Sequence, residues 1–176
     1  MLFVSLAAPA HAAVYLKQGE ALALAFPGAT TERRTAYLSD EQTRAVQNRA
    51  QARLSTRVVT YYSAFTGDTL AGVAFFDTRT VRTMPASFMV VVAPDTTVRR
   101  VEVLTFYEPE DYRPPARWLG LFGGKHLDGS LWPRRSIHNL GGATLTARAI
   151  TESVRLALAL FAVVDLAPPR AVGMTP

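Results

Sequence analysis

The stretch VVTYYSAFTGDTLAGVAFFDT, residues 58–78, decides the fold class of this 176-residue chain. It contains two runs rich in β-branched and aromatic residues, Val58–Phe65 and Thr69–Thr78, joined through Gly67-Asp68. Two such runs on either side of a short turn that contains glycine predict a β-hairpin. Hairpins of this kind build antiparallel sheets with one face on a core and one face free. The stretch therefore predicts an antiparallel sheet at the centre of the domain.

A second pair of strand-like runs follows further along the chain. Phe88–Ala93 and Val98–Tyr107 are joined through Pro94-Asp95-Thr96, and the second run alternates in part between apolar and polar residues. This pattern predicts a second hairpin in the same sheet.

Helical segments flank the predicted strands on both sides. They are expected over Glu20–Phe26, from Ser39 to about Arg53, over Arg117–Phe122, and from about Ala143 to Val164. The second of these helices begins with a capping box, since a glutamine follows Ser39 after three residues. The sequence thus predicts an α+β fold, an antiparallel β-sheet with covering helices and a long C-terminal helix after the Gly-Gly-Ala-Thr turn.

Composition excludes several classes of protein and site. The chain is 49% apolar and 19% charged, which excludes wholesale disorder. It has no cysteine, which excludes disulfides, thiolate metal sites and a cysteine nucleophile. Its three histidines have no partner four residues away, so no zinc site is predicted.

The net charge of +5 comes almost entirely from arginine. Pairs stand at Arg33-Arg34, Arg99-Arg100 and Arg134-Arg135, spread along the chain and mixed with acidic residues. A nucleic-acid-binding protein concentrates such charge on one element. The pattern therefore favours anionic ligands or surfaces in general, and no nucleic-acid partner is expected.

The N-terminal residues 1–12, MLFVSLAAPAHA, form an apolar run that ends in a small-x-small pattern. This is typical of a secretory signal, and the alternative is a buried strand or helix. The expected division is a signal remnant at 1–12, a helical attachment at 13–56, the main domain at 57–166 and a loose tail at 167–176. The apolar stretch Leu156–Leu166 is too short to span a bilayer and is interpreted as the buried end of the last helix.

One stretch indicates a binding site. Gly141-Gly142-Ala143-Thr144-Leu145 stands directly before the last predicted helix. Two glycines let the backbone approach a ligand closely, and a helix N-terminus offers free N–H groups and a positive dipole end. These features suit a phosphate group. The alternative is that the glycines only make the turn and Thr144 only caps the helix.

The segment Gly142–Thr146, followed by a helix rich in alanine and arginine, resembles the Ser-Gly-Ala-Thr-x-Thr signature of the FMN-binding domain family. This family includes the covalent-FMN subunits of the Rnf complex and of the sodium-translocating NADH:quinone reductase. Val103–Pro109 (VLTFYEP) is similar to the family's strand and glutamate-containing turn. Arg117–Lys125 (RWLGLFGGK) is similar to its aromatic-x-x-x-Phe-x-Gly-Lys segment. The resemblance covers residues 70–160, about half of the chain.

The resemblance implies that the side-chain oxygen of Thr144 is esterified to the phosphate of FMN. A separate exported flavin transferase, which uses FAD and a divalent metal, would attach it. The cofactor-binding residues so implied are Thr144, Gly141, Gly142, Ala143, Leu145, Thr146, Glu108, Trp118, Phe122 and Lys125. Further candidates are the aromatic residues Phe106 and Tyr112 beside the flavin ring, and Arg148 to offset the phosphate charge.

The function implied is that of an exported electron carrier. It would work in the periplasm or another extracytoplasmic space, in contact with membrane or periplasmic redox partners. No residue is assigned as a general acid or base. The family commonly has serine where Gly141 stands and an acidic residue where His138 stands, so covalent, non-covalent and lost flavin all remain open. The alternatives are a flavin-dependent reductase of a small substrate and an accessory module without flavin.

Overall fold

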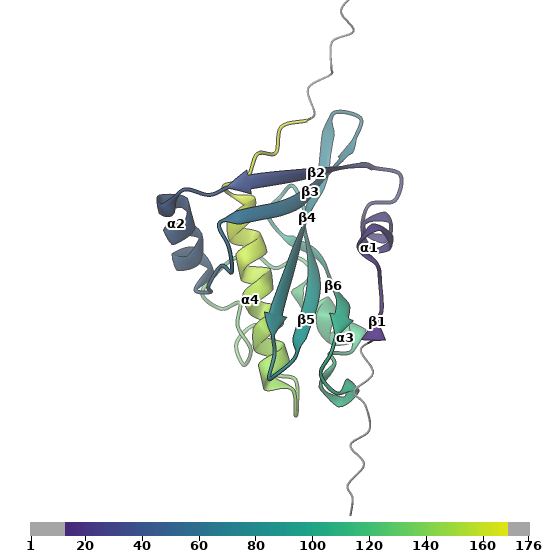
Figure 1. Cartoon of the computed structure of the whole chain (residues 1–176), viewed down its shortest axis with the longest axis vertical. Helices are drawn as coiled ribbons and strands as arrows, with labels where there is room; N and C mark the ends of the chain where they lie inside the picture. The colour runs from purple at the N-terminus through teal and green to yellow at the C-terminus, as the bar shows by residue number, and fades with distance from the viewer. Residues whose placement is uncertain (1–12, 169–176) are drawn as a thin grey trace, which may run out of the picture.

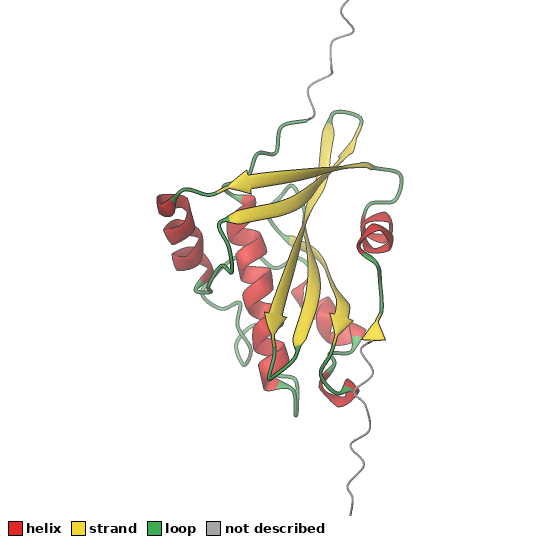
Figure 2. Cartoon of the chain, in the orientation of Figure 1, coloured by secondary structure: helices red, strands yellow, loops and turns green. Residues whose placement is uncertain are grey.

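The computed structural model describes residues 13–168 and contains a six-stranded antiparallel sheet (Figure 2). The first predicted hairpin is β3 (Val58–Thr66) and β4 (Thr69–Thr80), and the second is β5 (Pro85–Val92) and β6 (Val98–Phe106). The strand order is β1-β6-β5-β4-β3-β2, so neighbours in the sheet from β2 to β6 are also neighbours in the sequence. The predicted α+β class is confirmed.

Two edge strands were absent from the prediction. β1 (Ala13–Val14) pairs with β6, and β2 (Thr30–Tyr37) pairs with β3 along its whole length. Segment 13–56 is therefore not a purely helical attachment, because it supplies both edges of the sheet. β2 reads TTERRTAY, and a charged sequence of this kind suits an edge that must not pair with other chains. The same charges conceal the strand in a search for apolar alternation.

The larger core lies between one face of the sheet and three helices (Figure 1). These are α2 (Asp40–Ala50), the short α3 (Ala116–Leu119) and the long α4 (Thr144–Phe161). The most deeply buried side chains of this core include Tyr61, Phe75, Phe88, Phe106, Ile150 and Val154. Residues 156–161 of α4 are also buried, as predicted for the apolar stretch Leu156–Leu166, but the helix ends at Phe161, short of the expected Val164, and residues 162–166 lie beyond it, partly exposed.

A second, smaller core covers the opposite face of the sheet, which was expected to be free. There α1 (Gln18–Ala25) and the following Phe26 pack on strands β3 to β6. Gly72 in β4 allows this approach, because a Cβ atom there would lie 2.9 Å from the Val92 carbonyl oxygen and 3.1 Å from Cε1 of Phe26. Its φ of +152° also suits glycine alone.

The helix boundaries follow local capping chemistry. Ser39 Oγ accepts a hydrogen bond from the Gln42 backbone N–H at 3.1 Å, and Gln42 Oε1 accepts one from the Ser39 N–H at 2.9 Å. The predicted capping box is thus confirmed. The helix ends at Ala50, short of the expected Arg53, because Gln51 adopts a left-handed conformation with φ of 52°. The predicted helix over 117–122 is α3 followed by a 3-10 turn, η2 (Gly120–Phe122). A second 3-10 turn, η1 (Glu110–Tyr112), lies in the proline-rich turn after β6.

No helix within residues 13–168 combines the length and the hydrophobicity needed to cross a bilayer. The predicted signal at 1–12 and residues 169–176 of the predicted tail lie outside the described residues.

Candidate functional site

The Gly-Gly turn sets up the N-terminus of α4. Gly142 has φ of +74°, a left-handed conformation that favours glycine. Ala143 is the N-cap residue, and no side chain forms a capping hydrogen bond. Thr144 is the first residue of the helix, and its side chain is exposed. The expectation that Thr144 caps the helix is therefore wrong, because the turn places it one residue too late.

The first turn of α4 offers unpaired donors. Ala147 N–H donates to the Ala143 carbonyl oxygen at 3.0 Å. The N–H groups of residues 144–146 precede this bond and so have no partner within the helix. The first turn also carries no acidic side chain, so nothing on it offsets the positive end of the helix dipole. This end of the helix is suited to bind an anion.

Thr144 lines an open cleft of about 480 Å³. The seven lining residues are Trp132, Pro133, Arg134, Arg135, Asn139, Thr144 and Arg148. The volume lies within the range of about 300–1,000 Å³ that is usual for small-molecule sites. These seven residues include no carboxylate and no imidazole. The cleft can therefore hold an anion, but none of its lining side chains is suited to proton transfer.

Three arginines line the cleft. Arg148 Nε forms a salt bridge with Glu152 Oε1 at 2.9 Å, which offsets part of its charge, and Arg135 Nη1 donates to the Gly129 carbonyl oxygen at 2.6 Å. Arg134 has a φ of 66°, which is uncommon for a residue other than glycine. Guanidinium groups bind phosphate oxygens with charge-assisted, often bidentate hydrogen bonds. The cluster adds to the field of the helix N-terminus beside Thr144.

A buried arginine fixes the loop that forms the far side of the cleft. Arg155 of α4 is 2% exposed and donates to the carbonyl oxygens of Ala50 (2.6 Å), Asp128 (2.6 Å) and Leu131 (3.2 Å). Burial lowers the pKa of its guanidinium, and the nearby Asp128 carboxylate opposes that shift. Arg155 thus ties the end of α2 and the loop after residue 127 to the long helix.

Several predicted site residues belong to this turn. Gly141 and Gly142 form it, Leu145 is 50% exposed beside Thr144, and Ala143 and Thr146 are buried beneath it. The predicted residues 141–146 therefore lie together at the start of α4, around Thr144.

Glu108 serves a different part of the fold. Its Oε1 accepts the backbone N–H groups of Arg82 (2.9 Å), Thr83 (2.7 Å) and Met84 (2.9 Å), which form the turn between β4 and β5. Burial acts to raise the pKa of this carboxyl, but the three donors outweigh it and hold the pKa below its usual range. The carboxylate is a clamp on the turn and does not line the cleft.

The predicted aromatic partners of the flavin are core residues. Trp118 and Phe122 are buried and meet edge to face with ring centroids 5.3 Å apart, and Trp118 Nε1 donates to the His138 carbonyl oxygen at 2.7 Å. Phe106 is buried as well, and Tyr112 lies under the Arg82 guanidinium. None of these rings lines the cleft at Thr144.

Lys125 and Glu108 lie toward opposite ends of β6. The Lys125 carbonyl oxygen accepts the N–H of Val98 at the start of the strand, and Glu108 follows its end at Phe106. The eight residue steps between Val98 and Phe106 span about 26 Å of extended chain. The predicted residues therefore do not all form one site.

Five residues of the cleft wall were not among the predicted site residues: Trp132, Pro133, Arg134, Arg135 and Asn139. The Arg134-Arg135 pair was noted only as charge, although it stands six residues before Gly141. A tryptophan and two arginines shortly before a Gly-Gly turn were the signal available in the sequence.

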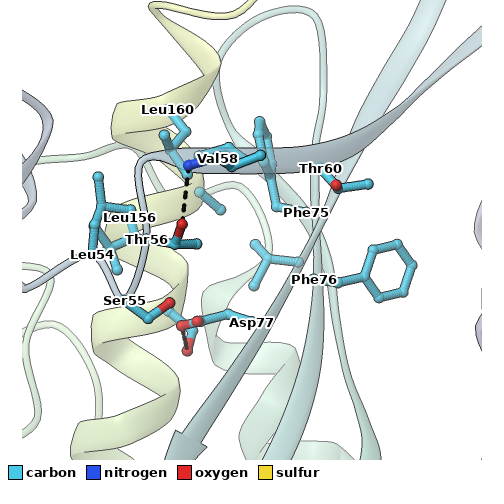
Figure 3. A pocket seen from close by; sticks show the side chains of 14 residues that line it. Leu54, Ser55, Thr56, Val58, Thr60, Phe75, Phe76, Asp77, Leu156 and Leu160 are labelled. Carbon is cyan, nitrogen blue, oxygen red and sulfur yellow. Dashed lines mark hydrogen bonds between the residues drawn. The ribbon is translucent and has the colours of Figure 1, made fainter. Parts of the chain in front are cut away.

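A second cavity lies between α4, β3, β4 and the loop over residues 54–56 (Figure 3). Its volume is about 80 Å³, and its labelled lining includes apolar Leu54, Phe75 and Leu156 with the polar Ser55 and Asp77. This is well below the size of about 300 Å³ at which small-molecule sites begin. The cavity exists because β3 pairs with β4 only as far as Tyr61 and Phe75, beyond which the two strands diverge.

Comparison with protein-family models, curated proteins and solved structures found no match to this chain.

Proposed function

We propose that this chain is an FMN-binding electron-transfer protein whose FMN is joined through a phosphoester to Thr144. The observation that carries the proposal is the surroundings of the Thr144 hydroxyl group. It is exposed at a helix N-terminus, it does not cap the helix, and it shares a cleft with Arg134, Arg135 and Arg148. The sequence resemblance to the FMN-binding domain family supports the same residue.

The residues present fit the cofactor. The N–H groups at the start of α4 and the three guanidinium groups suit a phosphate that keeps one negative oxygen after esterification. The cleft also contains an aromatic side chain, Trp132, for the flavin ring. Bound FMN would supply electron transfer in steps of one or two electrons, and the protein would hold and orient it.

In the attachment step, FAD would donate its FMN half to Thr144. Thr144 Oγ1 forms a bond to the phosphorus of the FMN half, the pyrophosphate P–O bond breaks, and AMP leaves with its electron pair. The hydroxyl proton passes to a base of the flavin transferase, since the cleft offers no carboxylate or imidazole. No group is oxidised or reduced. The chain is thus the acceptor in this reaction, and membrane or periplasmic redox partners would exchange electrons with the product.

Intact mass tests this proposal. The protein is produced in a periplasm together with a flavin transferase, denatured and weighed. We expect the mass to exceed that of the apoprotein by one FMN less one water, and we expect Thr144→Ala to lose this addition. Because Thr144 does not cap α4, the substitution should change the free energy of unfolding by less than about 0.5 kcal/mol.

Two further variants at the same position serve as controls. Thr144→Ser keeps a hydroxyl group and should keep the flavin, whereas Thr144→Val keeps the β-branched shape without a hydroxyl and should lose it. A folded wild-type protein without added mass would contradict the covalent attachment. A native protein that is yellow nonetheless would bind FMN non-covalently, and a colourless one would be an accessory module.

A further inference from the structure

Resting on the proposed function, we infer that Trp132 is the stacking platform for the flavin ring, fixed in place by Arg155 and Gln51. Trp132 lines the cleft, whereas Trp118 and Phe122, the aromatic residues that the resemblance implies, are buried in the core.

The backbone around Trp132 is held on both sides. Its N–H donates to the Ser130 carbonyl oxygen at 2.7 Å, and its own carbonyl oxygen accepts the N–H groups of Arg135 (3.1 Å) and Ile137 (3.3 Å). Asp128 Oδ1 also accepts the N–H groups of Ser130 (2.6 Å) and Leu131 (3.0 Å). The loop therefore holds the tryptophan in place before any ligand binds, which lowers the entropic cost of binding.

The side chain of Trp132 is fixed at one face and one edge. The Arg155 guanidinium carbon lies 4.7 Å from the ring centroid, and Nε1 donates to Gln51 Oε1 at 3.3 Å. Because a cation covers one face, the half-buried ring is left to present its other face to the cleft. Indole is electron-rich and isoalloxazine is electron-poor, so offset stacking between the two is favourable.

Arg155 acts through its position and does not line the cleft. Its donors are directed at backbone carbonyl oxygens of α2 and of the 128–131 loop, and no carboxylate forms a salt bridge with it among the described residues. A planar guanidinium can reach several carbonyls and lie flat against an indole at the same time, which an ammonium group cannot. These combined contacts to carbonyl oxygens and to the Trp132 ring explain why an arginine is buried at position 155.

Gln51 extends the site toward a neighbouring hollow. Its carboxamide oxygen is engaged by Trp132, so its NH₂ group remains available as a donor. It lines a hollow of about 530 Å³ together with Gln47 and Arg148, and Arg148 also lines the cleft. The pyrimidine edge of isoalloxazine carries two carbonyl oxygens. A ring stacked on Trp132 with this edge toward the hollow would meet amide donors.

Flavin fluorescence tests the stacking. Close contact with an indole quenches flavin emission by electron transfer, so the emission of protein-bound FMN should rise when the contact is removed. In FMN-loaded protein, verified by intact mass, we expect Trp132→Leu to raise the emission several-fold. Trp132→Phe keeps an aromatic face and should raise it less. Trp118→Phe is the matched control, because Trp118 is buried and does not line the cleft, and it should leave the emission unchanged.

A second variant separates positioning from packing. Arg155→Lys keeps the charge but loses the flat fork, so we expect a partial rise in flavin emission with the FMN still attached. Attached FMN whose emission is the same in wild type, Trp132→Leu and Arg155→Lys would overturn the stacking inference alone. A wild-type chain that carries no FMN would overturn the proposed function and this inference together.

Discussion

At the scale of single residues, Thr144 and Trp132 show what a motif leaves undetermined. The Gly-Gly-Ala-Thr order identifies Thr144 as a candidate. Its hydroxyl group does not cap the helix because the N-cap position is occupied by Ala143, and the sequence does not fix that boundary to one residue. Trp132, the proposed aromatic partner of the flavin, is held by long-range contacts, since Arg155 of α4 and Gln51 at the end of α2 both contact its ring. Sequence patterns identify a residue within a local motif, such as Thr144, more readily than a residue positioned by long-range contacts, such as Trp132.

Glu108 makes stability depend on pH in a defined direction. Its pKa is lowered in the folded protein, so its stabilising effect is fully present above the unfolded value of about 4.3 and is lost as the pH falls through the folded value. We expect Glu108→Gln to lower the free energy of unfolding by about 1–3 kcal/mol at pH 7, because three backbone N–H groups lose a charged acceptor. Urea unfolding at pH 7 and pH 3 measures the difference.

The control for this prediction is Glu41→Gln on the exposed first turn of α2. It should show much less loss at pH 7. A deficit of Glu108→Gln that stays constant from pH 7 to pH 3 would contradict the role of the carboxylate charge.

At the scale of elements, Gly72 couples α1 to the sheet. We expect Gly72→Ala to lower the free energy of unfolding by about 1–3 kcal/mol, because the new Cβ must displace the β5 backbone or Phe26. Gly19 in α1 is the matched control: a Cβ there meets nothing within 4 Å, and alanine should raise stability by up to about 1 kcal/mol. Thermal unfolding of the two variants should shift in opposite directions. Equal shifts would mean that the close approach at Gly72 is relaxed at little cost.

The sequence predicted the central strands within a few residues, since long β-branched runs such as 58–65 leave little alternative. It failed for β2, because charged residues such as Arg33 and Arg34 are compatible with an edge strand and with a loop. It also failed for the cleft wall over residues 128–139. That loop has no repeating hydrogen-bond pattern of its own, and its course depends on Arg155, a residue of a later helix.

At the scale of the whole molecule, the N-terminal quarter is part of the domain. It supplies both edge strands, the helix over the second core, and Leu38, Val46 and Ala50 to the larger core. We expect a fragment of residues 57–168 to lack a cooperative unfolding transition, because it would expose apolar surface on both faces of the sheet. Circular dichroism with thermal unfolding measures this against the full chain. A cooperative thermal unfolding transition in the fragment would instead support the prediction that residues 13–56 are a separate attachment.

The pairing of Ala13 with Phe106 has a consequence for how the nascent chain matures. At roughly 5–20 residues per second, a ribosome needs on the order of ten seconds to make the chain that separates them. Within this interval β3, the partner of β2, is complete at Thr66, whereas β1 has no partner until β6 is made. The hairpins can therefore form in order of synthesis, and closure of the β6 edge is the step that must wait for β1 and β6 to meet.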